Sequence, residues 1–88
     1  MKIKNGFMLR QIAGSWVVVP LGQRVVEFNG LMTLSDSGAL IWKSLEKGAE
    51  MDELINLLLS EYDIDENTVR TDTEELISNI RIRGLIDD

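Results

Sequence analysis

The sequence predicts an α+β domain in which an N-terminal β-meander of three to four short strands precedes three α-helices. Short apolar runs separated by turn residues extend to residue 34, and a helical spacing of apolar residues begins at residue 35. The length of 88 residues suits one domain. Because strands and helices occupy separate halves of the chain, we expect a winged-helix-like architecture, with residues 1–88 as a single domain.

The first two strands are predicted from a short gap between apolar runs. Strand-sized runs at residues 7–12 and 15–19 flank Ala13 and Gly14. A two-residue gap of this kind suits a β-hairpin. We therefore expect these runs to pair as neighbouring antiparallel strands.

A second hairpin is predicted around Asn29-Gly30. Apolar runs at residues 25–28 and 31–34 flank this dipeptide, and Asn-Gly between such runs strongly favours a hairpin turn. Both faces of this hairpin are largely apolar, so we expect each face to be covered.

The alternation of hydrogen bonds in that hairpin predicts which backbone groups remain open. Phe28 and Leu31 would close the turn as a hydrogen-bonded pair, and Thr33 would bond back to the same partner strand. The N–H and C=O groups of Met32 and Leu34 would then point to the open edge of the sheet.

Three helices are predicted over residues 35–48, 50–62 and 65–84 from caps, apolar stripes and glycine stops. Ser35 and Asp65 are placed to cap the first and third helices. The apolar stripes consist of Ala39, Ile41, Trp42 and Leu45, then Met51, Leu54, Ile55, Leu58 and Tyr62, and then Val69, Thr73, Leu76, Ile77 and Ile80.

The composition argues against an enzyme. The chain has no cysteine and no histidine, which excludes thiol nucleophiles, thiolate metal sites and the usual general base. The spacing of Asp63, Asp65 and Asn67 lacks the glycine of a calcium loop. The Asp36-Ser37 pair is explained by helix capping, since the strands before it do not fit an all-helical carrier protein. We expect no catalysis, no cofactor and no metal.

The distribution of charge argues against a nucleic-acid partner. Residues 1–34 carry four basic and one acidic side chain, net +3, whereas residues 35–88 carry five basic and fourteen acidic ones, net −9. The predicted helices would repel a phosphate backbone. A winged-helix DNA-binding or regulatory protein remains the alternative. No signal peptide and no membrane-spanning run is visible, so we expect a cytoplasmic protein without a membrane partner.

The junction between strand and helix carries a family resemblance. Leu34-Ser35-Asp36-Ser37-Gly38, followed by Ile41-Trp42 and Leu45, resembles the corresponding junction of the PqqD family of pyrroloquinoline quinone (PQQ) biosynthesis. The likeness extends over about residues 7–86. The chain also resembles the wider class of RiPP recognition elements. The segment 22–30 is longer than in the shortest PqqD proteins, which leaves PQQ or another modified peptide as the product.

The resemblance implies peptide capture. Such proteins bind the leader segment of a ribosomally made precursor peptide as an added strand and present it to a modifying enzyme, often a radical S-adenosylmethionine (radical SAM) enzyme. The leader would lie between the sheet edge and the third helix, and a homodimer through the same edge is left open. The residues implied at this peptide-binding site are Leu31, Met32, Thr33, Leu34, Asp72, Leu76, Asn79 and Arg83.

Overall fold

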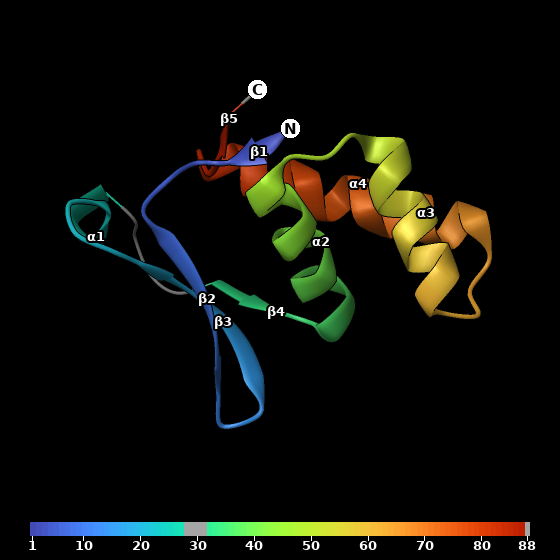
Figure 1. Cartoon of the computed structure of the whole chain (residues 1–88), viewed down its shortest axis with the longest axis horizontal. Helices are drawn as coiled ribbons and strands as arrows, with labels where there is room; N and C mark the ends of the chain where they lie inside the picture. Colours follow the sequence, from blue (N-terminus) through green and yellow to red (C-terminus); the bar gives the residue numbers. More distant parts are fainter. Residues whose placement is uncertain (28–31, 88) are drawn as a thin grey trace.

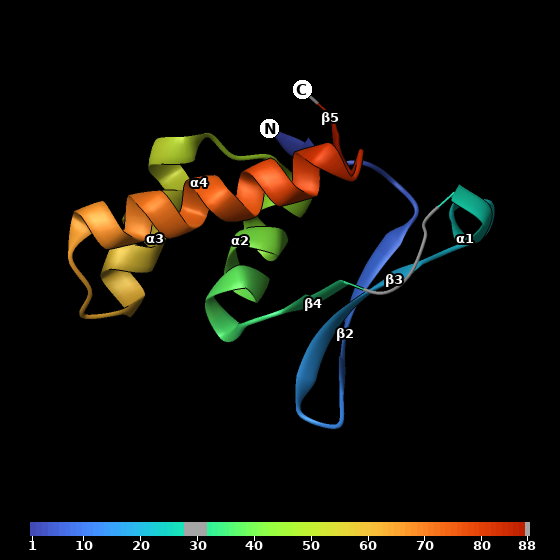
Figure 2. The same cartoon turned by 180° about the vertical axis from the view of Figure 1, so that it is seen from behind.

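The computed structural model describes residues 1–27 and 32–87 and places a small sheet beside a group of helices (Figures 1 and 2). The predicted α+β class is confirmed, because a three-stranded antiparallel sheet precedes three main helices. The elements are β1 (Lys2–Ile3), β2 (Phe7–Ile12), β3 (Ser15–Pro20), α1 (Arg24–Glu27), β4 (Met32–Leu34), α2 (Asp36–Lys47), α3 (Met51–Glu61), α4 (Glu66–Ile82) and β5 (Ile86–Asp87).

The sheet has the strand order β2-β3-β4, with β3 in the centre. Ala13 and Gly14 both have positive φ angles, 50° and 81°, which is the conformation of a type I′ turn. The predicted hairpin of β2 and β3 is therefore confirmed, and it extends away from the helices (Figure 1). The run of three valines in β3 suits a central strand, because β-branched side chains pack well on both faces of a sheet.

The strand predicted at residues 25–28 is wrong, because the described part of this segment belongs to the short helix α1. The side chain of Arg24 anchors the helix to the chain before β2. Its Nε donates a hydrogen bond of 3.0 Å to the carbonyl of Asn5, and its guanidinium lies 5.5 Å from the centre of the Phe7 ring. These contacts favour the short helix α1. The apolar run and the Asn29-Gly30 dipeptide after it had predicted a strand at this position.

The partner of β4 also differs from the prediction. Met32–Leu34 pairs with β3 and not with residues 25–28, and the register joins Val18 to Met32 and Trp16 to Leu34. Asn29-Gly30, the predicted turn, lies outside the described residues. The sheet thus ends at β4, whose outer side carries no strand among the described residues.

The three predicted main helices are confirmed, and their ends follow the caps identified in the sequence. The hydroxyl of Ser35 accepts a hydrogen bond of 3.1 Å from the N–H of Gly38, and Gly48 ends α2 with a φ of 99°. The carboxylate of Asp65 accepts a hydrogen bond of 3.0 Å from the N–H of Thr68 at the start of α4. Local signals were sufficient here because each cap lies within one turn of its helix.

The core lies between the helices and one face of the sheet. Trp42 and Leu45 of α2, Leu54 of α3 and Ile80 of α4 are fully buried, and Val18 reaches them from β3.

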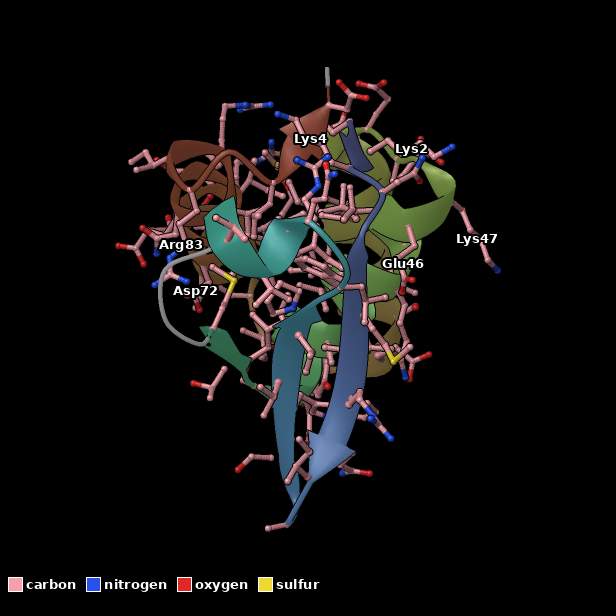
Figure 3. The ribbon with its side chains drawn as sticks, turned by 90° about the vertical axis from the view of Figure 1, so that its left-hand side faces the viewer. Lys2, Lys4, Glu46, Lys47, Asp72 and Arg83 are labelled. Atoms are coloured by element: carbon pink, nitrogen blue, oxygen red, sulfur yellow. The ribbon has the colours of Figure 1, made fainter. Side chains whose placement is uncertain are left out.

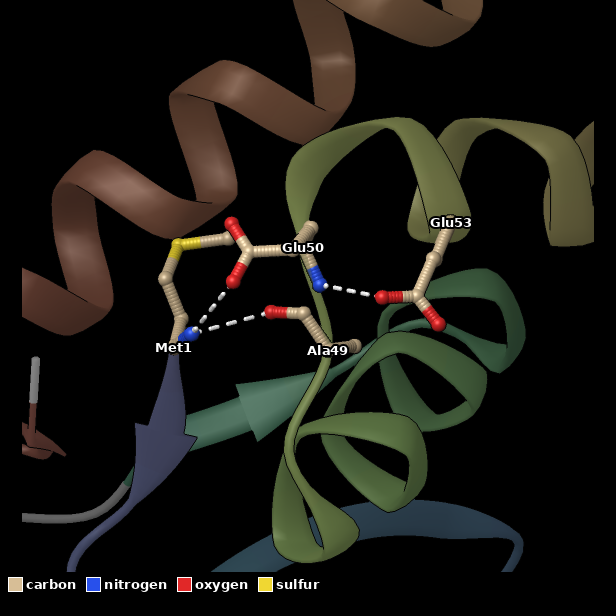
Figure 4. Close-up of polar contacts among 4 residues, drawn as sticks. All are labelled: Met1, Ala49, Glu50 and Glu53. Carbon is tan, nitrogen blue, oxygen red and sulfur yellow. Dashed lines mark hydrogen bonds and ion pairs between the residues drawn. The ribbon is translucent and has the colours of Figure 1, made fainter.

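The two ends of the described chain meet, which the sequence did not predict. β1 and β5 form a separate antiparallel pair. The ammonium group of Met1 donates a hydrogen bond of 3.0 Å to the carbonyl of Ala49 and lies 3.8 Å from the carboxylate of Glu50 (Figure 4). The N–H of Glu50 in turn donates to Glu53 at 3.0 Å. These contacts fix the connection between α2 and α3.

One side chain links the sheet to α2. The indole Nε1 of Trp16 donates a hydrogen bond of 3.1 Å to the carboxylate of Asp36. The ammonium of Lys43 lies 4.4 Å from the centre of the same ring, within the range of a cation–π contact. Because Trp16 is paired with Leu34, its contacts with Asp36 and Lys43 also hold β4 in place relative to α2.

Candidate functional site

The open side of β4 exposes the backbone groups of one described residue, Thr33, and the hydrogen bonds of the neighbouring strand β3 show why. The two-residue turn makes Ile12 and Ser15 a hydrogen-bonded pair, and such pairs alternate along antiparallel strands. The backbone groups of Ser15, Val17 and Val19 therefore point to β2, and those of Trp16 and Val18 point to β4.

The same alternation, carried across to β4, corrects a prediction. Met32 and Leu34 stand opposite Val18 and Trp16, so their N–H and C=O groups point inward. Thr33 points its backbone groups to the open edge. The sequence predicted the reverse, because it counted the register from a hairpin partner that β4 does not have.

A groove runs between this edge and the C-terminal part of α4. Its volume is about 450 Å³, and it is lined by Met32, Thr33, Asn79, Ile82 and Arg83. The side chain of Met32 belongs mostly to the core, with 9 % of the residue exposed, whereas Ile82 is 80 % exposed. The groove therefore combines a strand edge on one wall with apolar and polar side chains on the other.

One face of α4 is directed to this side of the molecule. Asp72, Leu76, Asn79 and Arg83 follow one another at intervals of four, three and four residues, which places them on one helical face. Asp72 and Arg83 project to the same side in Figure 3. The adjoining face of α4, about a quarter turn around the helix, is buried through residues that include Ile77 and Ile80.

The other end of the groove region is apolar. A Cβ atom at Gly38 would lie 3.4 Å from the Cβ of Leu34 and 3.5 Å from Cδ2 of Leu76, so both leucines lie against the start of α2. Met32 lines the groove together with the end of α4, whereas Leu34 lies beside Leu76, one turn before Asn79. β4 and α4 therefore run in opposite directions here.

The structure brings most of the residues implied by the resemblance to one place. Met32, Thr33, Asn79 and Arg83 line the groove, and the pair of Leu34 and Leu76 lies next to it. Asp72 lies one helical turn beyond Leu76 and does not line the groove. Leu31 is outside the described residues.

The sequence interpretation missed Ile82. Its signal was available, since it follows the last stripe residue of α4, Ile80, by two positions and so falls on another face of the helix. An exposed isoleucine beside a strand edge is a candidate contact for an apolar side chain of a partner.

Other kinds of site receive no support from the described residues. In residues 1–27 and 32–87, no group of three or more acidic, histidine or cysteine side chains could hold a metal ion. No helix within those residues has the length and apolar character needed to span a membrane. The exposed side chains of α3 and α4 include many acids, namely Asp52, Glu53, Glu61, Asp72, Glu74 and Glu75.

Among the carboxyl groups that the structure describes, that of Asp65 has a shifted pKa, and its role is structural. The hydroxyl of Thr68 donates a hydrogen bond of 2.7 Å to the Asp65 carboxylate, and the Thr68 N–H donates a second. These two bonds, in that order of importance, lower the pKa of Asp65 below its usual value. Asp65 caps α4 at the end remote from the groove.

Comparison with known proteins identifies the family. The family model described as coenzyme PQQ synthesis protein D (PqqD) matches residues 15–86. The chain belongs to the PqqD family. None of the curated proteins matches it.

Two solved structures have the same fold as this PqqD-family chain. One is described as TbiB1 in complex with the TbiA(beta) leader peptide; it is 25 % identical, covers 100 % of both chains and has a TM-score of 0.75. The other is a lasso peptide synthetase B1 complexed with the leader peptide, 20 % identical over 96 % of this chain and 93 % of that one, with a TM-score of 0.73. At 20 % identity the second shows the fold alone.

Proposed function

We propose that this chain is a non-catalytic adaptor that binds the leader segment of a ribosomally made precursor peptide in the groove between β4 and α4. The observation that carries the proposal is the groove itself, which has a volume of about 450 Å³ and lies between the open edge of β4 and the helix α4. The proposal is supported by the fold shared with TbiB1, which was solved with a leader peptide.

The energetics of strand addition fit this role. Each backbone hydrogen bond of an added strand contributes about 0.5–1.5 kcal/mol net, and each well-buried apolar side chain contributes about 1.5–3 kcal/mol. The two bonds at Thr33, together with contacts to Ile82 and Leu76, would offset part of the entropy lost by an ordered peptide.

The partner that performs the chemistry is a separate protein in this proposal. The chain has no histidine or cysteine, which suits a domain that presents a peptide to a modifying enzyme. We propose a radical SAM enzyme in that role, acting in PQQ synthesis or in the synthesis of a related peptide. Residues 1–88 act as one unit, and a homodimer formed through the β4 edge would compete with the leader.

The test is a titration of the leader of a precursor peptide encoded beside the gene, followed by fluorescence anisotropy of a label on the peptide. Asn79→Trp places a large side chain in the groove and should reduce affinity at least tenfold. Asn56→Trp makes the same change on an exposed site of α3 and should leave affinity unchanged. Both variants should unfold at the temperature of the parent protein.

Two outcomes would contradict the proposal. If both tryptophan variants bind the leader as the parent does, the groove is not the site. If the protein instead binds duplex DNA sequence-specifically with nanomolar affinity, the regulatory alternative is correct. We expect no such binding, because the exposed faces of α3 and α4 are acidic.

A further inference from the structure

The walls of the groove are not uniform, and this difference points to the kind of peptide that fits. Resting on the proposed function, we infer that the groove selects an extended segment with the pattern apolar–any–acidic. The middle residue bonds to the backbone of Thr33, and the acidic residue, two positions after the apolar one, lies beside Asn79 and Arg83.

The backbone sets the register of the peptide. Thr33 directs both its N–H and its C=O to the open edge, as the pairing of β3 with β4 requires. A peptide residue opposite Thr33 in an antiparallel ladder exchanges two hydrogen bonds with it. The residues before and after that central residue then stand opposite Leu34 and Met32, and their side chains lie on the groove side.

The two flanking positions meet different chemistry. The residue opposite Leu34 meets an apolar end, where Leu34 and Leu76 lie against Gly38. The residue opposite Met32 meets the end lined by Asn79 and Arg83. An amide donates two hydrogen bonds and a guanidinium five, so a carboxylate finds donors there even though Arg83 already makes a contact within the protein.

The direction of the peptide follows from the same two ends. Antiparallel pairing is slightly more stable per residue than parallel pairing. In that direction the N-terminal flanking residue lies at the Leu34–Leu76 end and the C-terminal one at the Arg83 end. Asp72, one turn beyond Leu76, would repel an acidic residue at the apolar end. The order of the pattern is therefore favoured by attraction at the Arg83 end and by repulsion at the Leu34–Leu76 end.

Three labelled synthetic peptides test the pattern in one host sequence. The first contains Leu–Thr–Glu, the second exchanges the order to Glu–Thr–Leu, and the third replaces the glutamate to give Leu–Thr–Gln. We expect the first to bind about tenfold more tightly than the second and severalfold more tightly than the third. In Arg83→Glu the preference for glutamate over glutamine should disappear.

Backbone methylation of the peptide tests the register without altering the protein. Methylation of the threonine nitrogen removes the donor directed at the Thr33 carbonyl and should reduce affinity at least tenfold. Methylation of the glutamate nitrogen, which points away from β4, is the matched control and should have little effect. The reverse result would overturn the assigned register.

The outcomes separate this inference from the proposed function. Equal affinities of the three peptides, or tighter binding of Glu–Thr–Leu, would overturn the inference while the leader itself still binds in the groove. A leader that binds neither the parent protein nor the variants would overturn both.

Discussion

The two edges of the three-stranded sheet differ in a way that their lengths do not suggest. β2 presents six residues and β4 only three. The alternation of hydrogen bonds directs the backbone groups of three residues of β2 outward, namely Phe7, Leu9 and Gln11. On the other edge, among the described residues of β4, those of Thr33 point outward. The longer edge offers more hydrogen bonds, yet the groove with a side-chain wall lies at the shorter one.

This comparison indicates that an open strand edge is not sufficient for a specific site. Backbone groups are the same in every peptide, so an edge alone cannot distinguish one strand from another. α4 supplies side chains of different chemistry along β4. The exposed face of β2 carries Arg10, and a charged side chain of this kind discourages unspecific strand pairing.

The largest effect is expected from a proline that breaks the inner ladder of β4. Met32→Pro removes the N–H that bonds to β3 and a side chain that is mostly buried. We expect a loss of about 3 kcal/mol or more in the free energy of unfolding, measured by chemical denaturation. A Met32→Pro variant as stable as the parent would mean that the register derived from the type I′ turn is wrong.

Proline substitutions on the two edges compare them directly. Thr33→Pro removes an outward N–H from β4, and Gln11→Pro removes one from β2. Both should remain folded, since neither group takes part in the ladder with β3. Leader affinity should fall at least tenfold in Thr33→Pro and stay unchanged in Gln11→Pro. The opposite result would make β2 the docking edge.

A smaller effect is expected when the wall beside β4 is trimmed. Ile82→Ser removes an exposed apolar side chain from the groove and should weaken leader binding by about 1–2 kcal/mol, or roughly five- to thirtyfold. Ile64→Ser, at another exposed isoleucine between α3 and α4, is the matched control. Equal losses of affinity in calorimetric titrations would show that the effect is not specific to the groove.

The smallest effect concerns the stability of the wall and its dependence on pH. Because the pKa of Asp65 is lowered by folding, its charge stabilises α4 fully above the unfolded pKa, and this contribution is lost as the pH falls through the folded pKa. Asp65→Asn keeps a capping oxygen but does not titrate. The parent should therefore exceed Asp65→Asn in thermal midpoint at neutral pH and lose that advantage in acid. A constant difference across pH would contradict this.

The helices were predictable because their signals are local. The caps at Ser35 and Asp65 and the stop at Gly48 act within one helical turn, and the structure places them as the sequence indicates. The family resemblance, carried by the junction that begins at Leu34, indicated the two elements of the candidate site, the strand β4 and the helix α4.

The errors lie where distant residues decide the structure. Asn29-Gly30 predicted a local hairpin, but β4 found its partner in the valine-rich β3, about fifteen residues earlier in the chain. A change of partner reverses which backbone groups face outward, so the roles of Met32 and Thr33 were exchanged. Arg24 shows the same limit, since its anchoring contact with Asn5 joins segments that no local pattern connects.

The two tryptophans give each layer its own optical signal. Trp42 is fully buried among the helices, and its fluorescence should remain blue-shifted until the core itself opens. Trp16 lies between Asp36 and Lys43 and is paired with Leu34 of β4, so its emission should respond when a strand is added to that edge. With one indole replaced by phenylalanine at a time, an unlabelled molecule would report peptide docking and global unfolding as separate spectroscopic events.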